Sequence, residues 1–242
     1  MKKTALITGA TKRIGEALTI HLASKGWNIA LHYNSSVEAA KQLSKDLQHK
    51  FPQAKFAIFQ ANLTKPKQIQ QLLSHVLIEF PTVDLLINNA SVFEPSGLKE
   101  TSFDLLESLM MVNFKAPLLL SRDFAKSTEK GLIINFVDTR ITSNKSNFAA
   151  YSLSKKALWE LTKMAALEFA PGIRVNAIAP GVTLAPEDKD EKYLLDLAKE
   201  IPMKKPGGLE PILRSLDFII ENDHLTGQLL FADGGENLGK NE

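Results

Sequence analysis

Short apolar runs rich in β-branched residues alternate along the chain with longer amphipathic segments. The segments between the runs, such as Val37–Phe51 and Ile69–Phe80, carry apolar residues at spacings of three and four, which predicts helices. Strands that alternate with helices in this way build a parallel sheet covered by helices on both faces. The near-continuous hydrophobicity of the short runs predicts about seven strands buried on both sides: Thr4–Thr8, Trp27–Tyr33, Lys55–Gln60, Val83–Asn88, Leu132–Val137, Ile173–Ile178 and Gln228–Phe231.

Two of the helical segments, Phe103–Thr128 and Phe148–Ala170, have more apolar residues than the cover of one sheet face requires. They predict either close packing on the sheet or a contact with another subunit. Between the last two strands we expect a substrate loop at about 180–207, with a short helix near Lys189–Glu200. The sequence has no internal repeat or linker, and we therefore interpret residues 1–242 as one domain.

The composition narrows the classes of function. The chain is 44% apolar and 23% charged, as in ordinary globular proteins, and its net charge of +2 comes without a long run of one sign. We therefore expect no nucleic-acid partner. No apolar stretch approaches the roughly 20 residues that span a bilayer, so we expect no membrane contact and a cytoplasmic location. The absence of cysteine excludes disulfides and thiolate chemistry, and the five scattered histidines predict no metal site.

The first predicted strand runs directly into a glycine-containing turn, Thr8 to Gly15, and then into a helix. A dinucleotide pyrophosphate needs this geometry, because small residues let backbone amides approach it and a helix N-terminus offers unpaired N–H groups. Gly9 and Gly15 supply the tight turn and the close approach of helix to strand. A glycine pair after a strand also occurs in ordinary turns, and only its position favours the phosphate site.

The second predicted strand ends in Tyr33-Asn34-Ser35-Ser36, without the acidic residue that usually holds the ribose hydroxyls of NAD. A 2′-phosphate would meet no repulsion there, and Lys12, Ser35 and Ser36 are the groups that would bind it. The sequence therefore predicts NADPH as the cofactor. Lys12 is alternatively a solvated surface lysine.

Tyr151 and Lys155 lie four residues apart, on one face of a predicted helix. The ammonium group is expected to lower the pKa of the phenol toward neutrality, as suits a proton donor. Thirteen residues earlier, Asp138 follows the fifth predicted strand at the edge where ligands bind. An ionised carboxylate would repel the oxyanion that forms from a carbonyl group, whereas it suits a ring C=N acceptor. Asp138 thus favours a pterin substrate.

Together these motifs resemble the short-chain dehydrogenase/reductase family over essentially the whole chain, and within it the pteridine reductases. Arg13 stands where the family's TGxxxGxG turn has its middle glycine, as in the TGxxxRxG turn of pteridine reductases. Most family members have serine where this chain has Asp138. The segment Asn88-Asn89-Ala90 resembles the family's NNA motif. The resemblance implies that Ser91 contacts cofactor phosphate and substrate, and that Phe93 stacks on the pterin.

Further along, Asn113 matches the asparagine of the family's catalytic tetrad, whose helix has a local bend and an ordered water near the lysine. Asn113 is alternatively a buried amide with satisfied hydrogen bonds. Pro180-Gly181-Val182-Thr183 resembles the segment that meets the nicotinamide carboxamide. The role of Arg140 stays open between an acidic substrate tail and a neighbouring subunit.

The resemblance implies a Rossmann-type doubly wound parallel sheet, a homotetramer, and NADPH-dependent reduction of a dihydropteridine of the dihydromonapterin, dihydrobiopterin or dihydrofolate type. Two alternatives stay open, a 3-oxoacyl carrier-protein or other carbonyl reductase and a non-catalytic NADP-binding sensor. The expected catalytic residues are Tyr151, Lys155, Asp138 and Asn113, and the expected substrate contacts are Arg13, Ser91, Phe93, Asp138 and Tyr151. The expected cofactor contacts are Gly9, Lys12, Arg13, Ile14, Gly15, Tyr33, Asn34, Ser35, Ser36, Asn62, Leu63, Asn89, Ala90, Ser91, Tyr151, Lys155, Pro180, Gly181 and Thr183.

Overall fold

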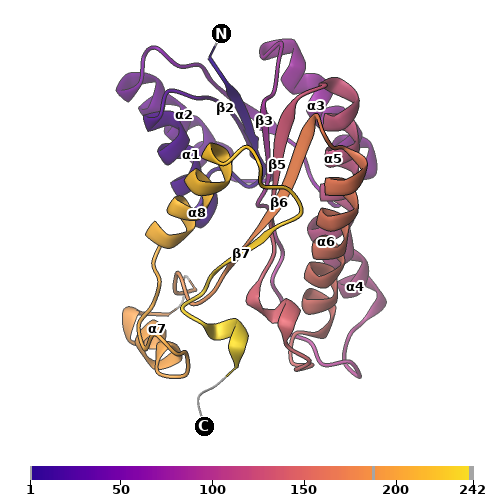
Figure 1. Ribbon diagram of the computed structural model, residues 1–242, viewed down its shortest axis with the longest axis vertical. Helices are drawn as coiled ribbons and strands as arrows, with labels where there is room; N and C mark the ends of the chain where they lie inside the picture. The colour runs from indigo at the N-terminus through magenta and orange to yellow at the C-terminus, as the bar shows by residue number, and fades with distance from the viewer. Residues whose placement is uncertain (1, 187–188, 240–242) are drawn as a thin grey trace.

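A computed structural model describes residues 2–186 and 189–239 of the chain. Seven strands form one parallel sheet in the order β3-β2-β1-β4-β5-β6-β7, with helices on both of its faces (Figure 1). The strands are β1 (Thr4–Ile7), β2 (Asn28–Tyr33), β3 (Phe56–Gln60), β4 (Leu85–Asn88), β5 (Gly131–Phe136), β6 (Ile173–Pro180) and β7 (Leu229–Ala232). This confirms the predicted Rossmann-type fold and all seven expected strands, whose ends shift by two residues at most.

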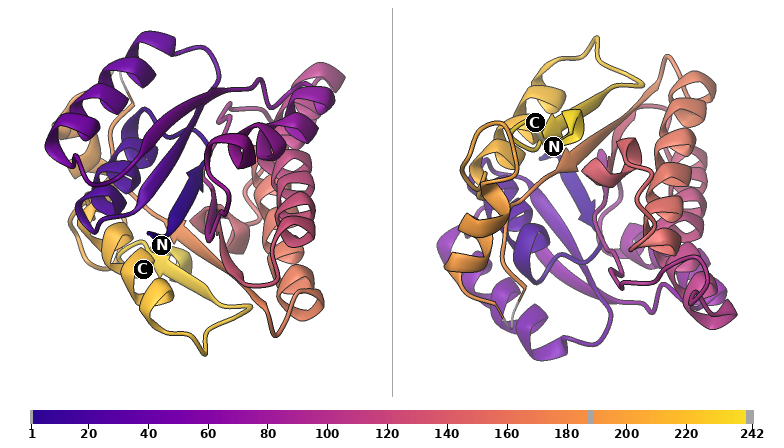
Figure 2. Two further views of the ribbon diagram at one scale, coloured as in Figure 1. Left: turned by 90° about the horizontal axis from the view of Figure 1, so that it is seen from above. Right: turned by 90° about the horizontal axis from the view of Figure 1, so that it is seen from below.

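Each face of the sheet is covered by its own layer of helices (Figure 2). On one face lie α1 (Arg13–Ser24), α2 (Val37–Lys50) and α8 (Glu210–Glu221), whose leucines and isoleucines belong to one core cluster. Helices α1 and α2 pack on β2 and β3, and α8 packs on β6 and β7. The other face carries α3 (Pro66–Glu79) and α5 (Ala116–Ser127). The same layer includes α6 (Ala149–Glu168), the second of the long helices expected from the sequence. Apolar stripes at helical spacing on two sides of a buried sheet produce these layers.

The first long apolar segment is not one regular helix. It begins as α4 (Phe103–Met110), passes through a π-helical stretch at Met111–Lys115, and continues as α5. The bend expected near Asn113 is therefore a π-bulge, a feature often found at functional sites. In the loop between β6 and α8 the short helix α7 (Glu191–Ala198) lies within the range expected for it.

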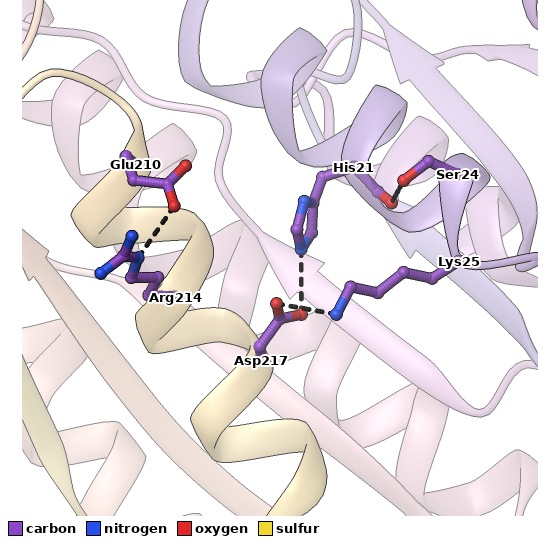
Figure 3. A network of polar contacts seen from close by, with 6 residues as sticks. All are labelled: His21, Ser24, Lys25, Glu210, Arg214 and Asp217. Carbon is purple, nitrogen blue, oxygen red and sulfur yellow. Dashed lines mark hydrogen bonds and ion pairs between the residues drawn. The ribbon is translucent and has the colours of Figure 1, made fainter.

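A polar cluster on the surface joins the first and last helices of one layer (Figure 3). Asp217 on α8 accepts hydrogen bonds from Nε2 of His21 on α1 at 2.9 Å and from Nζ of Lys25, the residue that follows α1, at 2.8 Å. Exposed ion pairs of this kind contribute little to stability but fix the relative position of two helices. The cluster holds α8, which follows the long loop, against the helix that begins at the glycine turn.

The sheet reverses its strand order between β1 and β4, because β2 and β3 lie on one side of β1 and β4 to β7 on the other. Ligands of open α/β sheets bind in the crevice at the carboxyl ends of the strands around this point. Two short 3₁₀ turns, η2 (Thr139–Thr142) after β5 and η3 (Glu236–Leu238) after β7, lie at the same edge. Within the described residues we find no helix long and apolar enough to cross a bilayer.

Candidate active site

The turn between β1 and α1 has room only for glycine at its two expected positions. Gly9 has φ +63°, a conformation that favours glycine. A Cβ on Gly15 would lie 1.9 Å from the carbonyl oxygen of Gly9, so no side chain fits there. The backbone of α1 thus begins directly against the turn. At this N-terminus Lys12 makes no side-chain capping bond, which leaves the first N–H groups for another acceptor. The cradle fits a pyrophosphate.

Residues that follow β4 hold the glycine turn in place through hydrogen bonds. The amide of Asn89 donates to the carbonyl oxygens of Thr8 at 2.9 Å and Gly9 at 3.2 Å. The backbone N–H groups of Asn89 and Ala90 each donate to the Thr8 hydroxyl at 3.0 Å. Asn89 and Ala90 were expected as cofactor contacts, and here their polar groups hold the shape of the turn.

His32 on β2 is a part of the turn that sequence reasoning missed. Its Nδ1 accepts the N–H of Gly9 at 3.1 Å, and its Nε2 donates to the carbonyl of Ala61 at 2.9 Å. Burial lowers the pKa of His32 to about 4, against the smaller opposing effect of the Ala61 bond, so the ring is neutral near pH 7. A histidine inside an otherwise apolar buried strand was the signal that could have identified it.

Arg13 takes a glycine-like conformation, with φ +55°, at the first residue of α1. Its guanidinium donates to the backbone carbonyls of Leu184 at 3.2 Å and Ala185 at 2.8 Å, in the loop after β6. We expected this side chain beside the pyrophosphate and the substrate. In the structure it ties the glycine turn to the loop, because the fork geometry of arginine suits two neighbouring carbonyls. Its contacts with cofactor and substrate stay predictions.

The residues expected around the adenosine lie at the end of β2 and just beyond β3. Asn34 and Ser35 are exposed, and Ser36 precedes α2 without a side-chain capping bond. Asn62 is already occupied, because its Oδ1 accepts the backbone N–H and the hydroxyl of Thr64 at 2.9 and 2.8 Å. Leu63 packs in the core. Ser35 is thus the exposed serine of the expected set, whereas Ser36 is partly buried, and their contact with a phosphate stays a prediction.

Asp138 and Tyr151 form the centre of the group of residues expected to be catalytic. The Tyr151 hydroxyl donates to Asp138 Oδ2 at 2.7 Å, and the backbone N–H of Arg140 donates to Asp138 Oδ1 at 2.8 Å. The carboxylate is therefore fixed by its own turn, η2, while it holds the phenol on α6. Lys155, one helical turn after Tyr151, is buried and donates to the carbonyl of Phe136 at 2.8 Å.

The expected lowering of the Tyr151 pKa was wrong. Burial is the largest cause of a pKa well above the ordinary value for tyrosine, and the charge and hydrogen bond of Asp138 raise it further. The cation of Arg140 and a hydrogen bond with Ser91 oppose this rise without reversing it. Burial also lowers the pKa of Lys155 to about 8, although Asp138 acts in the other direction. In the structure the phenol keeps its proton, and the carboxylate has more influence on it than the ammonium.

Asn113 lies in the π-helical stretch and is fully buried. Its Oδ1 accepts the N–H of Val92 at 2.9 Å and the hydroxyl of Ser91 at 3.1 Å. Its Nδ2 donates to the carbonyl of Val92 at 2.9 Å and to Ser154 Oγ at 3.0 Å. The helix is thus bent at Asn113, and the side-chain amide has all its hydrogen bonds satisfied within the protein. These bonds tie the segment after β4 to α6, and a catalytic role of Asn113 stays a prediction.

The rings of Phe93 and Phe148 form an aromatic group beside the ring of Tyr151. Phe93 is 53% exposed, stacks on Phe148 with ring centroids 4.5 Å apart, and meets the ring of Tyr151 edge-on at 4.6 Å. The guanidinium carbon of Arg140 lies 4.3 Å from the centroid of Phe148 and 5.9 Å from that of Phe93. The exposed part of Phe93 can therefore receive a flat heterocycle next to the phenol.

The segment after β6 and the turn after β7 form another wall. A Cβ on Gly181 would lie 2.7 Å from Asp233, and the Thr183 hydroxyl donates to the carbonyl of Gly181 at 2.9 Å. Sequence reasoning also missed Glu236 in η3. Burial, and then the charges of Asp138 and Asp233, raise the pKa of its carboxyl group. Glu236 directly follows Gly235, which has a left-handed conformation. No spacing rule in the sequence indicates that Glu236 lies near Asp138.

Residues 3–192 match the family model described as short chain dehydrogenase. Among curated proteins, a 3-oxoacyl-[acyl-carrier-protein] reductase FabG from Staphylococcus epidermidis is 30% identical over 246 residues, which cover 97% of this chain and 99% of the relative.

Two solved structures are similar over 99% of the chain, both at 31% identity. They are FolM Alternative dihydrofolate reductase 1 from Brucella canis, complexed with NADP, with a TM-score of 0.91 and 96% of that chain covered, and its counterpart from Brucella suis, also in complex with NADP, with a TM-score of 0.93 and 97% covered.

Proposed function

Since the chain belongs to the short chain dehydrogenase family of oxidoreductases, we propose that it reduces a dihydropteridine with NADPH. The observation that carries the proposal is the hydrogen bond of 2.7 Å between the Tyr151 hydroxyl and the carboxylate of Asp138. Serine is the residue that the family resemblance leads one to expect at this position. A carboxylate there changes which acceptors the phenol can serve.

The cofactor part of the proposal rests on the glycine turn. The uncapped N-terminus of α1 and the space that only glycine can leave at Gly9 and Gly15 suit a pyrophosphate. Lys12 and the exposed Ser35 would hold the 2′-phosphate, and Lys155 would hold the nicotinamide ribose. NADP in both FolM structures supports the same choice. Bound NADPH would supply a hydride to the acceptor carbon.

The class of substrate group that accepts the hydride follows from the negative charge of Asp138. Reduction of a carbonyl group places negative charge on the carbonyl oxygen, which would lie beside its proton donor, Tyr151. The carboxylate of Asp138 would repel that oxyanion. A ring C=N bond instead needs one proton on nitrogen, and the amino and amide N–H groups of a pterin are donors for which a carboxylate is a good acceptor. Phe93 offers the flat ring a partly exposed aromatic face next to the phenol.

In this proposal Tyr151 delivers the proton to the ring nitrogen. A nitrogen that has just received electron density from hydride addition is strongly basic, so a phenol with a raised pKa still protonates it. Asp138 keeps the proton on Tyr151 until then and fixes the position of the phenolic oxygen. Lys155, protonated at pH 7 with a pKa of about 8, balances the negative charge left on the phenol. Solvent then returns the proton.

A carbonyl reductase is the second candidate, because the 3-oxoacyl reductase from Staphylococcus epidermidis is 30% identical over nearly the full length of both chains. The experiment that separates the candidates follows NADPH absorbance with 7,8-dihydrobiopterin, with dihydrofolate, with an acetoacetyl thioester, or with no acceptor. Oxidation with the dihydropteridines alone supports our proposal. Oxidation with the thioester alone would assign the carbonyl reaction, and no oxidation with any acceptor would indicate a cofactor-binding protein without catalysis.

A further inference from the structure

Arg140 lies in the candidate active site beside Phe93, Phe148 and Asp138, and its side chain differs from those of the other arginines in its partners. The chain has five arginines. The side chains of four of them form hydrogen bonds or ion pairs with oxygen atoms of the protein. Arg13 and Arg174 bind backbone carbonyls at 2.8 to 3.5 Å, while Arg122 and Arg214 pair with carboxylates at 2.7 to 2.8 Å. The guanidinium of Arg140 has one weak contact, at 3.4 Å to Asn147 Oδ1, and pairs with no carboxylate within 4.0 Å in residues 2–186 and 189–239.

The side chain is nevertheless held in place. Its guanidinium carbon lies 4.3 Å from the centroid of Phe148, and its backbone N–H is fixed on Asp138 at 2.8 Å. Stacking on an aromatic ring orients a guanidinium while leaving its N–H edge free for hydrogen bonds. The same residue therefore anchors the catalytic carboxylate through its backbone and presents an oriented cation with free donors through its side chain.

The location of this cation relates it to the substrate. Phe148 stacks on Phe93 at 4.5 Å, and the Arg140 carbon is 5.9 Å from the centroid of Phe93, the ring on which we place the pterin. A planar ring lying on Phe93 beside Tyr151 would therefore lie near Arg140, and we place the side-chain substituent of the ring toward the guanidinium. The charge of Arg140 acts to lower the pKa of Glu236, against the larger effects of burial and of Asp138, so these charged groups lie near one another. Among residues 2–186 and 189–239, neither carboxylate forms an ion pair with Arg140.

We infer that Arg140 is a specificity-determining residue that binds a carboxylate on the substrate's side chain, so that pteridines with an acidic tail, such as dihydrofolate, are preferred over those with a neutral polyol tail. The planar fork of arginine matches a carboxylate with two parallel hydrogen bonds, and a polyol has no group of that charge. The inference rests on the proposed reduction of dihydropteridines and names the substrate class within it.

The test compares dihydrofolate with 7,8-dihydrobiopterin in steady-state kinetics of the wild type and Arg140→Met. Methionine keeps an apolar side chain against Phe148 and removes only the charged donors. We expect KM for dihydrofolate to rise by roughly 10-fold or more with kcat nearly unchanged, since a hydrogen bond to a charged group is worth at least a factor of ten. KM for dihydrobiopterin should stay within about two-fold. Arg140→Lys, which keeps the charge, should recover part of the loss.

Lys145→Met is the matched control, because it removes one exposed positive charge from the same loop outside the aromatic group. It should leave both KM values unchanged. Equal losses on the two substrates in Arg140→Met, or none, would overturn the role of Arg140 while the proposed reduction stands. A wild type that reduces neither substrate would overturn the proposed function and the inference together.

Discussion

At the scale of single residues, the pairing of Asp138 with Tyr151 changes the chemistry that the tyrosine and lysine spacing alone predicts. In the expected arrangement Lys155 lowers the pKa of the phenol, whereas here burial and Asp138 raise it. A phenol of this kind is a reluctant acid and suits an acceptor that becomes strongly basic during reduction. In the proposed function the carboxylate therefore selects the acceptor in two ways, through the proton on Tyr151 and through its own charge.

Replacing Tyr151 with phenylalanine tests the proton donor. The change removes the hydroxyl and leaves the ring that Phe93 contacts edge-on at 4.6 Å, so the pocket should keep its shape. We expect kcat for dihydropteridine reduction to fall by about 10²–10⁴-fold, as loss of a general acid does. NADPH binding, followed by fluorescence of the reduced nicotinamide, should be nearly unchanged. A variant that turns over at the wild-type rate would remove Tyr151 from the reaction.

At the scale of elements, we expect the N-terminus of α1 and the end of the neighbouring strand β2 to determine the preference for NADPH. Lys12 is exposed beside the uncapped first turn of the helix. If it binds the 2′-phosphate, Lys12→Ala should cost about 1–3 kcal/mol of NADPH binding and almost none of NADH binding. Titration calorimetry with both cofactors measures the difference. Equal losses for the two would show that Lys12 acts on the fold or on the shared pyrophosphate.

His32 links the same strand to the glycine turn and makes stability depend on pH. Its folded pKa of about 4 lies below the ordinary 6.5, so the unfolded chain binds the proton more tightly between these values. The stabilising contribution is therefore complete above pH 6.5 and is lost as the pH falls toward 4. The difference corresponds to on the order of 3 kcal/mol.

Urea unfolding at pH 7 and at pH 4.5 measures that contribution. The wild type should lose more stability between the two than His32→Gln, whose side chain has no charge to gain. His49→Gln, which removes an exposed histidine, should behave as the wild type does. An identical pH dependence in all three proteins would contradict a buried neutral His32 as the brace of the turn.

The elements themselves were predictable because their signals are local. Continuous apolar runs identified each strand within two residues, and the glycines identified the tight turn between β1 and α1. Side-chain partners were less predictable, since they depend on how distant loops meet. The contact of Arg13 with Leu184 joins residues 171 positions apart, and the rise in the Tyr151 pKa depends on burial that spacing does not reveal.

At the scale of the whole molecule, α4 and α6 leave large apolar side chains exposed in the monomer. Phe103 is 75% exposed, Met164 67% and Leu167 85%. Burying such a surface in a symmetric contact stabilises an oligomer, and we expect a dimer or a homotetramer. Light scattering at micromolar concentration measures the mass directly. Leu167→Glu should shift it toward smaller species, whereas Ile78→Glu, an exposed position on α3, should not. A stable wild-type monomer would contradict the expectation.

For the reaction of the whole enzyme, we propose that the carboxylate of Asp138, hydrogen-bonded to Tyr151, commits this fold to a ring C=N acceptor. The most direct measurement is the ratio of kcat/KM for a dihydropteridine to kcat/KM for a ketone or 3-oxoacyl thioester, in the wild type and in Asp138→Ser. We predict that the variant loses pteridine reduction and gains activity on the carbonyl acceptor, because serine donates a hydrogen bond to an oxyanion that a carboxylate repels. A variant that reduces dihydropteridines as fast as the wild type would contradict the claim.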